Sequence, residues 1–499
     1  MITLTPQTLL RLSAVMTLSL TLAACSLAPD YKTPDVSVPA HFKEEAMNPN
    51  APVDLKAQWS EAKPAADQSR GPWWEMFNDR ELSQLVIEAT NSNQNLAAMA
   101  ARVEQARQTA VIEGAALFPM ISGEAGVQRA MSSAAGTGIP GPFKPETIYR
   151  AGLGLSYEID LFGRVRNTRA AAAANTAAVA SDFNSMLLTL QSDVAQLYFT
   201  MRGQDAEIKL LRETLGLRKD SLKILEKRRD VGTVTDLEVA QNIVDLENTR
   251  AALEQLESER SRNENALAVL LGKAPAEFSL AQKPLSAQAP KVPAGLPSTL
   301  LERRPDIAAA QYNLMAANAR IGIARAAFFP SLSLTASGGF ASESLGKLFD
   351  WSSRTWAIGP LMTLPIFQGG RIVAENERTK AAYAESVAIY RQQVLGAFQD
   401  VEDTLSRLKM RDAQAQSYGR AKAAADKAAR LASLRFESGD TGYLEEIEAK
   451  QSALNAGRAV IQTQAGKMVD TVQLVRALGG DFTADFGGVR PTPAAPKKQ

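Results

Sequence analysis

The stretch that decides the fold is YRAGLGLSYEIDL, residues 149–161. Apolar residues and tyrosine occupy every second position, and polar residues or glycine occupy the positions between them. A period of two over such a length predicts a β-strand with one apolar face. Weaker runs around residues 121–127, 332–340 and 356–366 predict three further strands. The sequence therefore predicts four strands in two hairpins, with loops rich in glycine, serine and proline at residues 130–148 and 341–353.

Each predicted hairpin leads into a proline-free tract, residues 146–274 and 366–490, that can hold very long helices. In the first tract Leu190, Leu197, Leu211 and Leu225 recur at multiples of seven residues, and a second apolar series follows four residues behind. Such heptads predict coiled-coil packing. We expect an outgoing helix over residues 167–230, about 95 Å long at about 1.5 Å per residue, and a returning helix over 235–271. Shorter helices are expected over residues 82–117 and 300–328.

The sequences of the two tracts match each other, so the body of the chain is an internal duplication of one unit. When the first tract is aligned with the second at a nearly constant shift in residue number, Arg228-x-x-x-Gly232 aligns with Arg435-x-x-x-Gly439. Gly232 and Gly439 are expected to end the outgoing helices, because glycine tolerates the positive φ that a helix stop commonly needs. The predicted organisation is a lipoprotein signal peptide over residues 1–24, an acylated tether over 25–70, a first repeat over 71–280, a proline-rich connector over 281–300, a second repeat over 301–480 and a flexible tail over 481–499.

The N-terminus has the pattern of a bacterial export signal. Arg11 precedes an apolar run that is too short to span a bilayer stably. The run ends Leu22-Ala23-Ala24-Cys25-Ser26, which resembles a lipobox. We expect Cys25 to become the first residue of the mature chain, to carry acyl chains such as palmitate, and to tether the protein to the outer membrane of a Gram-negative cell. An inert buried cysteine is the alternative. The lone His41 falls in the tether, where a solvated residue is expected and not a catalytic base.

Composition excludes several classes of function. Lys and Arg number 55 against 54 Asp and Glu, and the formal charge of +1 argues against nucleic acid as a partner. One Cys and one His cannot build a thiolate cluster or an imidazole zinc site, so neither a metal nor a cofactor is expected. The sequence has no complete dinucleotide fingerprint, P-loop, HExxH or Gly-x-Ser-x-Gly motif. We therefore expect a protein that is not an enzyme.

Four strands in one chain cannot close a barrel. Lipid does not tolerate an open sheet edge, because each unpaired backbone group there costs several kcal/mol. Strands that enter a membrane must therefore close with copies from other chains. Two chains would supply eight strands around a filled interior, and three would supply twelve around a water-filled channel. The alternative is a soluble strand pair lying on a helical bundle, but the export signal and the acylation site favour the membrane.

Several short motifs carry a family resemblance. They are Trp73-Trp74-x-x-Phe77, Ala101-Arg102-Val103-x-Gln105-Ala106-Arg107, Tyr157-Glu158-Ile159-Asp160-Leu161-Phe162-Gly163-Arg164, Leu301-Glu302-Arg303-Arg304-Pro305-Asp306-Ile307, Ala324-Arg325-Ala326-Ala327-Phe328-Phe329-Pro330 and Arg476-Ala477-Leu478-Gly479-Gly480. Together they resemble the signatures of the TolC/OprM-type outer-membrane efflux channels, in the lipoprotein branch that partners resistance-nodulation-division (RND) pumps. The resemblance spans residues 70–480.

The resemblance implies a mainly α fold with a transmembrane β portion. It implies a homotrimer with a twelve-stranded β-barrel in the outer membrane, continuous with an α-helical tunnel of twelve helices in the periplasm. It also implies docking to a periplasmic adaptor (membrane fusion protein) and to an inner-membrane pump of the RND type. The function implied is passive exit of drugs and other small molecules across the outer membrane, and with it antibiotic resistance.

The turns between outgoing and returning helices, residues 228–238 and 435–446, are the candidate gate. In similar channels these tips close the tunnel and touch the adaptor. Asp440 beside Gly439 would occur three times around a threefold axis, and such a ring repels itself and attracts cations. Family members often place an acid slightly later in this turn, where this chain has Thr441 and Gly442.

The other candidate gate residues belong to the same tips. They are Asp236, Glu238, Glu445, Glu446, Arg228 and Arg435. A solvated charge at a helix end is the alternative for each. Arg228 and Arg435 could tie neighbouring tips together by ion pairing, although an exposed pair contributes only about 0–1 kcal/mol. Gly232 and Gly439 are expected to shape the turns that contact the adaptor.

Two other functions fit part of the pattern. A related channel for protein or peptide secretion of the type I kind would share the fold, although the lipid anchor and Arg303-Arg304-Pro305-Asp306 favour small-molecule efflux. A periplasmic coiled-coil adaptor typically has one helical hairpin flanked by β-domains, whereas this chain duplicates strands plus hairpin.

Overall fold

The computed structural model describes residues 26–39, 42–43, 71–131, 144–285, 288–290, 292 and 303–480. The chain falls into two compact units. The first takes Met1–Asp35, Arg102–Ala180 and Ala309–Arg391, and the second takes Val36–Ala101, Ser181–Ala308 and Gln392–Gln499. Each unit therefore contains part of both predicted repeats, so a repeat of the sequence is not a unit of packing.

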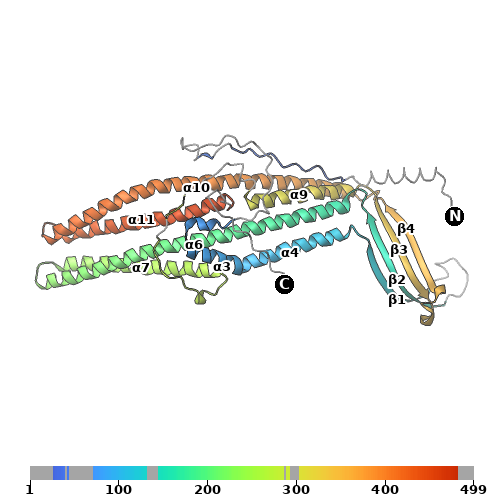
Figure 1. Ribbon diagram of the computed structural model, residues 1–499, viewed down its shortest axis with the longest axis horizontal. Helices are drawn as coiled ribbons and strands as arrows, with labels where there is room; N and C mark the ends of the chain where they lie inside the picture. Colours follow the sequence, from blue (N-terminus) through green and yellow to red (C-terminus); the bar gives the residue numbers. More distant parts are fainter. Residues whose placement is uncertain are drawn as a thin grey trace. The chain divides into compact units, whose positions relative to one another are not determined.

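The first unit holds one antiparallel sheet of four strands in the order β1-β2-β3-β4 (Figure 1). The strands are β1 (Met120–Ala130), β2 (Glu146–Ile159), β3 (Ser331–Ser342) and β4 (Arg354–Thr363), which confirms the four predicted strands. β2 pairs with β3 from Tyr149 opposite Ser342 to Ile159 opposite Leu332, so the two hairpins join into one sheet. Within the described residues, β1 and β4 each have a partner strand on one side only.

The end of β4 differs from the prediction. The strand ends at Thr363, so the expectation of a strand through residue 366 is wrong at its last residues. Pro365 has no N–H to donate to a ladder, which is why the chain leaves the sheet there. Pro360 is accommodated inside β4 because β4 is an edge strand of the described sheet.

Two glycines let β2 and β3 approach each other closely. A Cβ added at Gly339 would lie 2.3 Å from the carbonyl oxygen of Ala151, and one added at Gly152 would lie 2.9 Å from the carbonyl oxygen of Gly338. Glycine usually weakens a strand, but here any side chain would push the two backbones apart. The glycines of the alternating stretch therefore belong to the sheet and do not interrupt it.

The motif at residues 157–164 makes the turn from β2 into α6 (Arg164–Asp230). The Asp160 carboxylate accepts the backbone N–H groups of Val165 at 3.1 Å and Arg166 at 2.9 Å. These bonds satisfy two of the free donors at the start of the helix. Phe162 stacks on Phe329 with ring centroids 4.7 Å apart, so the Phe-Pro step of the second repeat packs against this turn.

The two repeats contain helices of equal length. α6 and α10 (Arg371–Glu437) have 67 residues each, and α7 (Asp236–Leu270) and α11 (Tyr443–Ala477) have 35 each. The helical stretch expected over residues 82–117 forms α3 (Arg80–Ser92) and α4 (Gln94–Ala115), and α9 covers Pro305–Ala326. The chain breaks at Asn93, whose side-chain oxygen accepts the N–H of Leu96 at 2.9 Å. Among the described residues, no helix combines the length and apolar character needed to cross a membrane.

The second unit is built around the predicted heptad series of α6. Leu190, Val194, Met201, Ile208 and Leu211 from that series are all at most 6% exposed. The period of seven therefore marks a buried seam, as the coiled-coil prediction requires.

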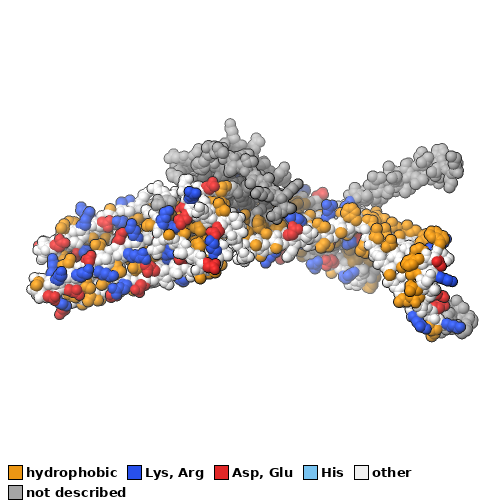
Figure 2. Space-filling view, turned by 60° about the horizontal axis from the view of Figure 1, so that its bottom comes forward, with side chains coloured by type: hydrophobic (Ala, Val, Ile, Leu, Met, Phe, Trp, Pro, Cys, Tyr) orange, Lys and Arg blue, Asp and Glu red, His pale blue; other side chains and the backbone are white. Residues whose placement is uncertain are grey.

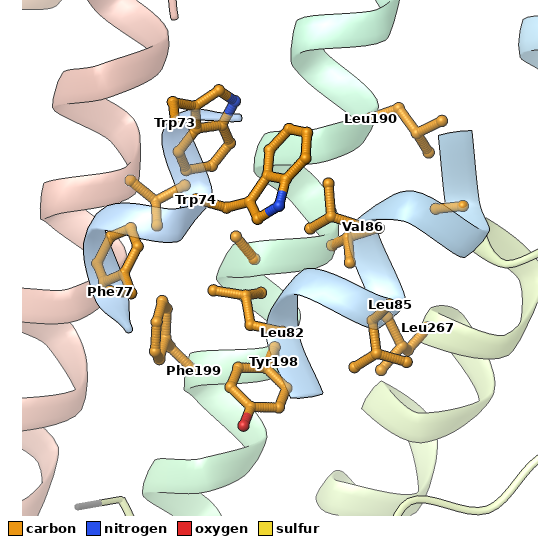
Figure 3. Close-up of a cluster of buried hydrophobic side chains, with 14 of the residues drawn as sticks. Trp73, Trp74, Phe77, Leu82, Leu85, Val86, Leu190, Tyr198, Phe199 and Leu267 are labelled. Carbon is orange, nitrogen blue, oxygen red and sulfur yellow. The ribbon is translucent and has the colours of Figure 1, made fainter. Parts of the chain in front are cut away.

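The Trp-Trp-x-x-Phe motif is part of the core beside this seam (Figure 3). It forms the short 3₁₀ helix η1 (Trp73–Phe77), whose three aromatic side chains pack among residues of α3, α6 and α7. Phe77 and Phe199 approach with ring centroids 4.8 Å apart. Burying one large apolar side chain contributes about 1.5–3 kcal/mol, so this motif stabilises the unit and needs no further role.

A buried charge network lies further along α6. The Asp205 carboxylate, which is 0% exposed, accepts Arg202 Nη1 at 2.9 Å and Arg260 Nε at 2.7 Å. It also accepts the backbone N–H of Lys283 at 2.9 Å. One carboxylate therefore joins α6, α7 and the chain that leads out of the first repeat.

Parts of the predicted tether lie against the folded chain. Within the first unit, residues 26–35 contact α6 and α9, and Phe42 is fully buried in the second unit. Cys25, His41, the predicted signal peptide over residues 1–24 and the predicted tail over 481–499 lie outside the described residues.

Candidate functional site

The two helix turns have the same geometry. Gly232 has a φ of 76° and Gly439 a φ of 81°, as expected for the residues that end the outgoing helices. One residue later the backbone N–H bonds back to the arginine carbonyl, from Thr233 to Arg228 at 2.9 Å and from Asp440 to Arg435 at 2.8 Å. The repeated Arg-x-x-x-Gly spacing therefore places the arginine carbonyl and the residue after the glycine where one hydrogen bond closes the turn.

In the first turn the two predicted acids differ. The Glu238 carboxylate accepts both the backbone N–H and the hydroxyl of Thr235, so it caps the start of α7. The Asp236 side chain is 92% exposed, and the nearest Arg229 nitrogen lies 4.0 Å away. Of these two carboxylates, Asp236 is the one available to ions or to a partner.

In the second turn most charges are paired. Arg435 forms an ion pair with Glu445 at 2.6 Å, which joins α10 to α11 of the same hairpin. Glu446 is buried and accepts Ser433 Oγ at 2.8 Å and Lys450 Nζ at 2.6 Å. Both glutamates therefore have local structural partners.

Asp440 is exposed on the second turn. Its carboxylate accepts only a short-range bond from Ser438 Oγ at 3.0 Å among the hydrogen bonds described for it. Its carboxylate faces solvent, as that of Asp236 does. Among the acids predicted for the gate, these two aspartates have exposed carboxylates that do not cap a helix or join two helices.

The arginines of the two turns act differently. Arg435 pairs within its own hairpin, whereas the Arg228 guanidinium lies over the Phe436 ring at 5.7 Å from its centroid. Arg228 therefore links the first turn to the second through a cation–π contact. Ion pairing of Arg228 between neighbouring tips stays a prediction.

Tyr443 is a contact residue that the sequence did not indicate. It is 4% exposed and packs with Leu225 and Val239 of the first hairpin. Its hydroxyl accepts the Asn242 side-chain amide and lies 3.5 Å from Ser221 Oγ. A residue at the start of α11 thereby fastens the second hairpin to α6 and α7.

Arg218 makes a second link between the hairpins. It pairs with Asp245 at 2.7 Å and donates from Nη2 to Gln451 Oε1 of α11 at 2.8 Å. Burial lowers the pKa of Arg218 and raises that of Asp245, so desolvation outweighs their attraction. Arg218 stands seven residues after Leu211, and a charge at a heptad position is the signal that could have found it.

The Arg-Arg-Pro-Asp motif is a structural site in the second unit. Arg304 pairs with Asp306 at 2.6 Å and Asp400 at 3.0 Å, and donates to the Ala477 carbonyl at 3.0 Å. Burial alone would raise the pKa of Asp306, but Arg304 and the Gln393 amide hold it below its ordinary value. The start of α9 is therefore tied to both α10 and the end of α11.

These features define the class of protein. The described residues hold a four-stranded sheet and two long helical hairpins, and the chain that carries them belongs to the outer membrane efflux protein family. The sequence pattern of the family matches residues 85–273 and 296–480. The family expected from the motifs is confirmed, and the chain is an outer-membrane efflux channel protein.

Individual relatives sharpen the comparison. The chain is 35% identical over 474 residues to the toluene efflux pump outer membrane protein TtgC of Pseudomonas putida, which covers 93% of this chain and 94% of that protein. It is 32% identical over 470 residues to the cation efflux system protein CusC of Escherichia coli, with 93% and 97% covered. The solved outer-membrane channel OprN is similar in fold, with a TM-score of 0.82, 29% identity and coverage of 91% of this chain and 99% of that one.

Proposed function

We propose that three copies of the chain form the exit channel of a tripartite efflux system. The observation that carries the proposal is the sheet in which β1 and β4 each keep one edge without a partner in the described chain. In lipid these edges must be paired, because no water is present to bind the free N–H and C=O groups. Three sheets joined edge to edge give twelve strands and a barrel wide enough for water.

The surface of the sheet supports a membrane location. Ile121, Leu153, Trp356 and Ile358 are each at least 63% exposed. Figure 2 shows hydrophobic side chains over the sheet and many charged side chains over the helical hairpins. Water disfavours such exposed apolar side chains, whereas lipid accepts them. On this proposal the sheet lies in the outer membrane and the hairpins project into the periplasm.

The gate lies at the tips of the hairpins. Three copies of Asp236 and Asp440 place six carboxylates around the aperture, which attracts cations to it. Tyr443 and Arg218 hold the two hairpins of each chain together, and the aperture widens when these contacts break. The support for this gate is the exposure of the two aspartates and the position of both links between hairpins.

The partners follow from the same proposal. A periplasmic adaptor (membrane fusion protein) contacts the turns at Gly232 and Gly439, and an inner-membrane pump of the RND type supplies the cargo. Exit through the channel is passive and needs no catalytic group. Relatives named for toluene and cation efflux support small molecules rather than proteins as the cargo.

The experiment that tests the channel combines conductance with cell sensitivity. Purified protein is expected to run as a trimer and to conduct ions in planar bilayers. A deletion strain is expected to become more sensitive to dyes, detergents and antibiotics, and the parent gene to restore resistance. A monomer that does not conduct would refute the channel. Unchanged sensitivity together with a defect in protein secretion would favour the secretion channel instead.

Cys25 is proposed as the attachment point of the acyl chains. A Cys25→Ser variant should lose labelling by radioactive palmitate, whereas Ser26→Ala should keep it. Continued labelling of Cys25→Ser would contradict the lipoprotein proposal.

A further inference from the structure

The sheet has one apolar face and one polar face. Ile121 of β1 lies opposite Leu155 of β2, which lies opposite Ala336 of β3. Ala336 in turn lies opposite Ile358 of β4, so one apolar row crosses all four strands on the same face. The other face carries the acids of the strands and one arginine, namely Glu124, Glu146, Arg150 and Glu158. In the proposed channel the apolar face meets lipid and the polar face lines the pore.

Two arginines are the charged side chains of the apolar face in the described strands. Arg129 stands an even number of positions after Ile121, and Arg354 an even number before Ile358, so both belong to this face. Both are exposed at the end of the sheet away from the junctions with α4, α6, α9 and α10 (Figure 1). Lipid strongly disfavours an arginine at the middle of the bilayer but tolerates it near the surface. This end of the sheet therefore lies at the outer surface of the membrane in the proposed channel.

Among the described residues, neither arginine forms an ion pair with an acid. Arg354 is held by its own turn, where Nη1 donates to the carbonyl of Trp351 at 2.9 Å and the guanidinium lies 4.6 Å from the centre of the Trp351 ring. The loop sequence that follows Arg129, residues 131–145, contains no Asp or Glu. Glu146 lies opposite Ala130, which puts its side chain on the polar face. Both guanidinium groups therefore keep donors for an external anion.

The two arginines also lie on the two edge strands, Arg129 on β1 and Arg354 on β4. In the proposed trimer β4 of one copy pairs with β1 of the next, and neighbouring strands lie about 4.8 Å apart. The outer ends of these strands then meet, which brings Arg354 of one copy near Arg129 of the next. The two positive charges repel each other unless an anion lies between them. A phosphate suits this position, because its oxygens accept hydrogen bonds from both guanidinium groups.

We propose that Arg354 of one copy and Arg129 of the next form a clamp for the phosphate groups of a lipid in the outer leaflet of the membrane. The clamp rests on the proposed trimer and occurs three times in it. A lipid fits better than a soluble phosphate, because exposed apolar side chains adjoin both arginines on the same face, Val127 on β1 and Trp356 on β4. The acyl chains lie on this apolar surface while the headgroup binds the clamp. The bound lipid thereby covers the boundary between two copies from outside.

Lipid A, whose sugar headgroup carries phosphate groups, is the probe for the clamp. The purified full-length protein is titrated with lipid A in detergent, and the lipids bound to each trimer are counted by native mass spectrometry. We expect Arg129→Gln and Arg354→Gln each to weaken binding by about tenfold, the effect of losing one hydrogen bond to a charged group. Arg150→Gln is the matched control, because it removes the same charge from the polar face of the same sheet. Its affinity for lipid A should equal that of the parent.

A second lipid separates the phosphate from the acyl chains. Phosphatidylethanolamine should bind about tenfold more weakly than lipid A, because its own ammonium group neutralises its phosphate. Equal affinity for the two lipids would mean that the acyl chains alone bind, and would overturn the clamp. Unchanged binding of lipid A in both Arg129→Gln and Arg354→Gln, or an equal loss in Arg150→Gln, would also overturn it.

The salt dependence of the parent tests the clamp even where a variant does not assemble. Lipid A should bind more weakly as the salt concentration rises, because salt screens exposed charges; binding that does not change with salt would overturn the clamp. The channel and the clamp also fail differently. A conducting trimer that does not retain lipid A would overturn the clamp and leave the channel intact. A protein that runs as a monomer would refute the channel and the clamp together, because the clamp needs two copies.

Discussion

Removing the hydroxyl of Tyr443 should make the channel open more often. The hydroxyl accepts the Asn242 amide, and Asn242 is only 1% exposed. Tyr443→Phe keeps the ring among Leu225 and Val239 but leaves that buried amide without an acceptor. The variant therefore weakens the contact between the hairpins without emptying the core.

The size of the expected change in open probability follows from the loss of one hydrogen-bond acceptor in each chain. Leaving a buried donor unsatisfied costs about 1–3 kcal/mol. At about 1 kcal/mol per chain, three chains that open together lose about 3 kcal/mol, which shifts the balance of closed and open forms by roughly 150-fold. Open probability at neutral pH should rise accordingly.

Single-channel recording in planar bilayers measures this open probability. The matched control is Tyr418→Phe, because Tyr418 lies on α10 and is 40% exposed. Asn242→Ala should add little to Tyr443→Phe, since both variants remove the same bond. An open probability of Tyr443→Phe equal to that of the parent and of Tyr418→Phe would refute the reasoning.

The remaining predictions concern four aspartates and one control. Asp236→Ala and Asp440→Ala should each lower the preference for cations over anions, because one charge at about 4 Å in water contributes about 1 kcal/mol, or about fivefold in local cation concentration; unaltered reversal potentials would remove both from the aperture. The lowered pKa of Asp306 means that its ionised form stabilises the fold above the ordinary value of 3.8, and that this stability is lost as the pH falls through the folded pKa. The melting temperature of the parent should therefore fall more steeply below pH 4 than that of Asp306→Asn. If the melting temperatures of the two proteins fall in parallel with pH, ionised Asp306 does not stabilise the fold. Asp205→Asn should lose about 3–5 kcal/mol of stability, because two buried arginines lose their shared partner, and its melting temperature should fall well below that of Asp412→Asn, whose exposed pair with Lys467 contributes about 0–1 kcal/mol. Equal melting temperatures of these two variants would show that the buried network is not stabilising.

The strands and long helices could be predicted because their signals are local. Alternation at residues 149–161 and the heptads from Leu190 to Leu225 each report one buried face of one element. The last predicted strand was too long because the apolar pattern continues beyond Thr363, where β4 ends. Pro365 has no backbone N–H to donate to a neighbouring strand. Pairing of β2 with β3 was not predicted, since residues 159 and 332 are brought together only by folding.

The candidate site was predicted in part. The turns at Gly232 and Gly439 were found because positive φ selects glycine. The sequence put Asp440 first and named the other acids of the tips as further candidates without distinguishing them. In the structure Glu238, Glu445 and Glu446 have local partners. Tyr443 was missed because its partners belong to the other hairpin.

By itself the sequence determined the elements, their duplication and the family, because periodicity, proline and glycine act on the nearest residues of the chain. Only the tertiary structure decided which charges are exposed, which residues join the hairpins and where residues 26–35 lie. These depend on burial and on partners far away in sequence, as Tyr443 with Asn242 and Ser26 with Asn167 illustrate. The sequence determines which side chains can carry a charge. Whether that charge is paired, buried or exposed depends on the residues that surround it in the folded chain.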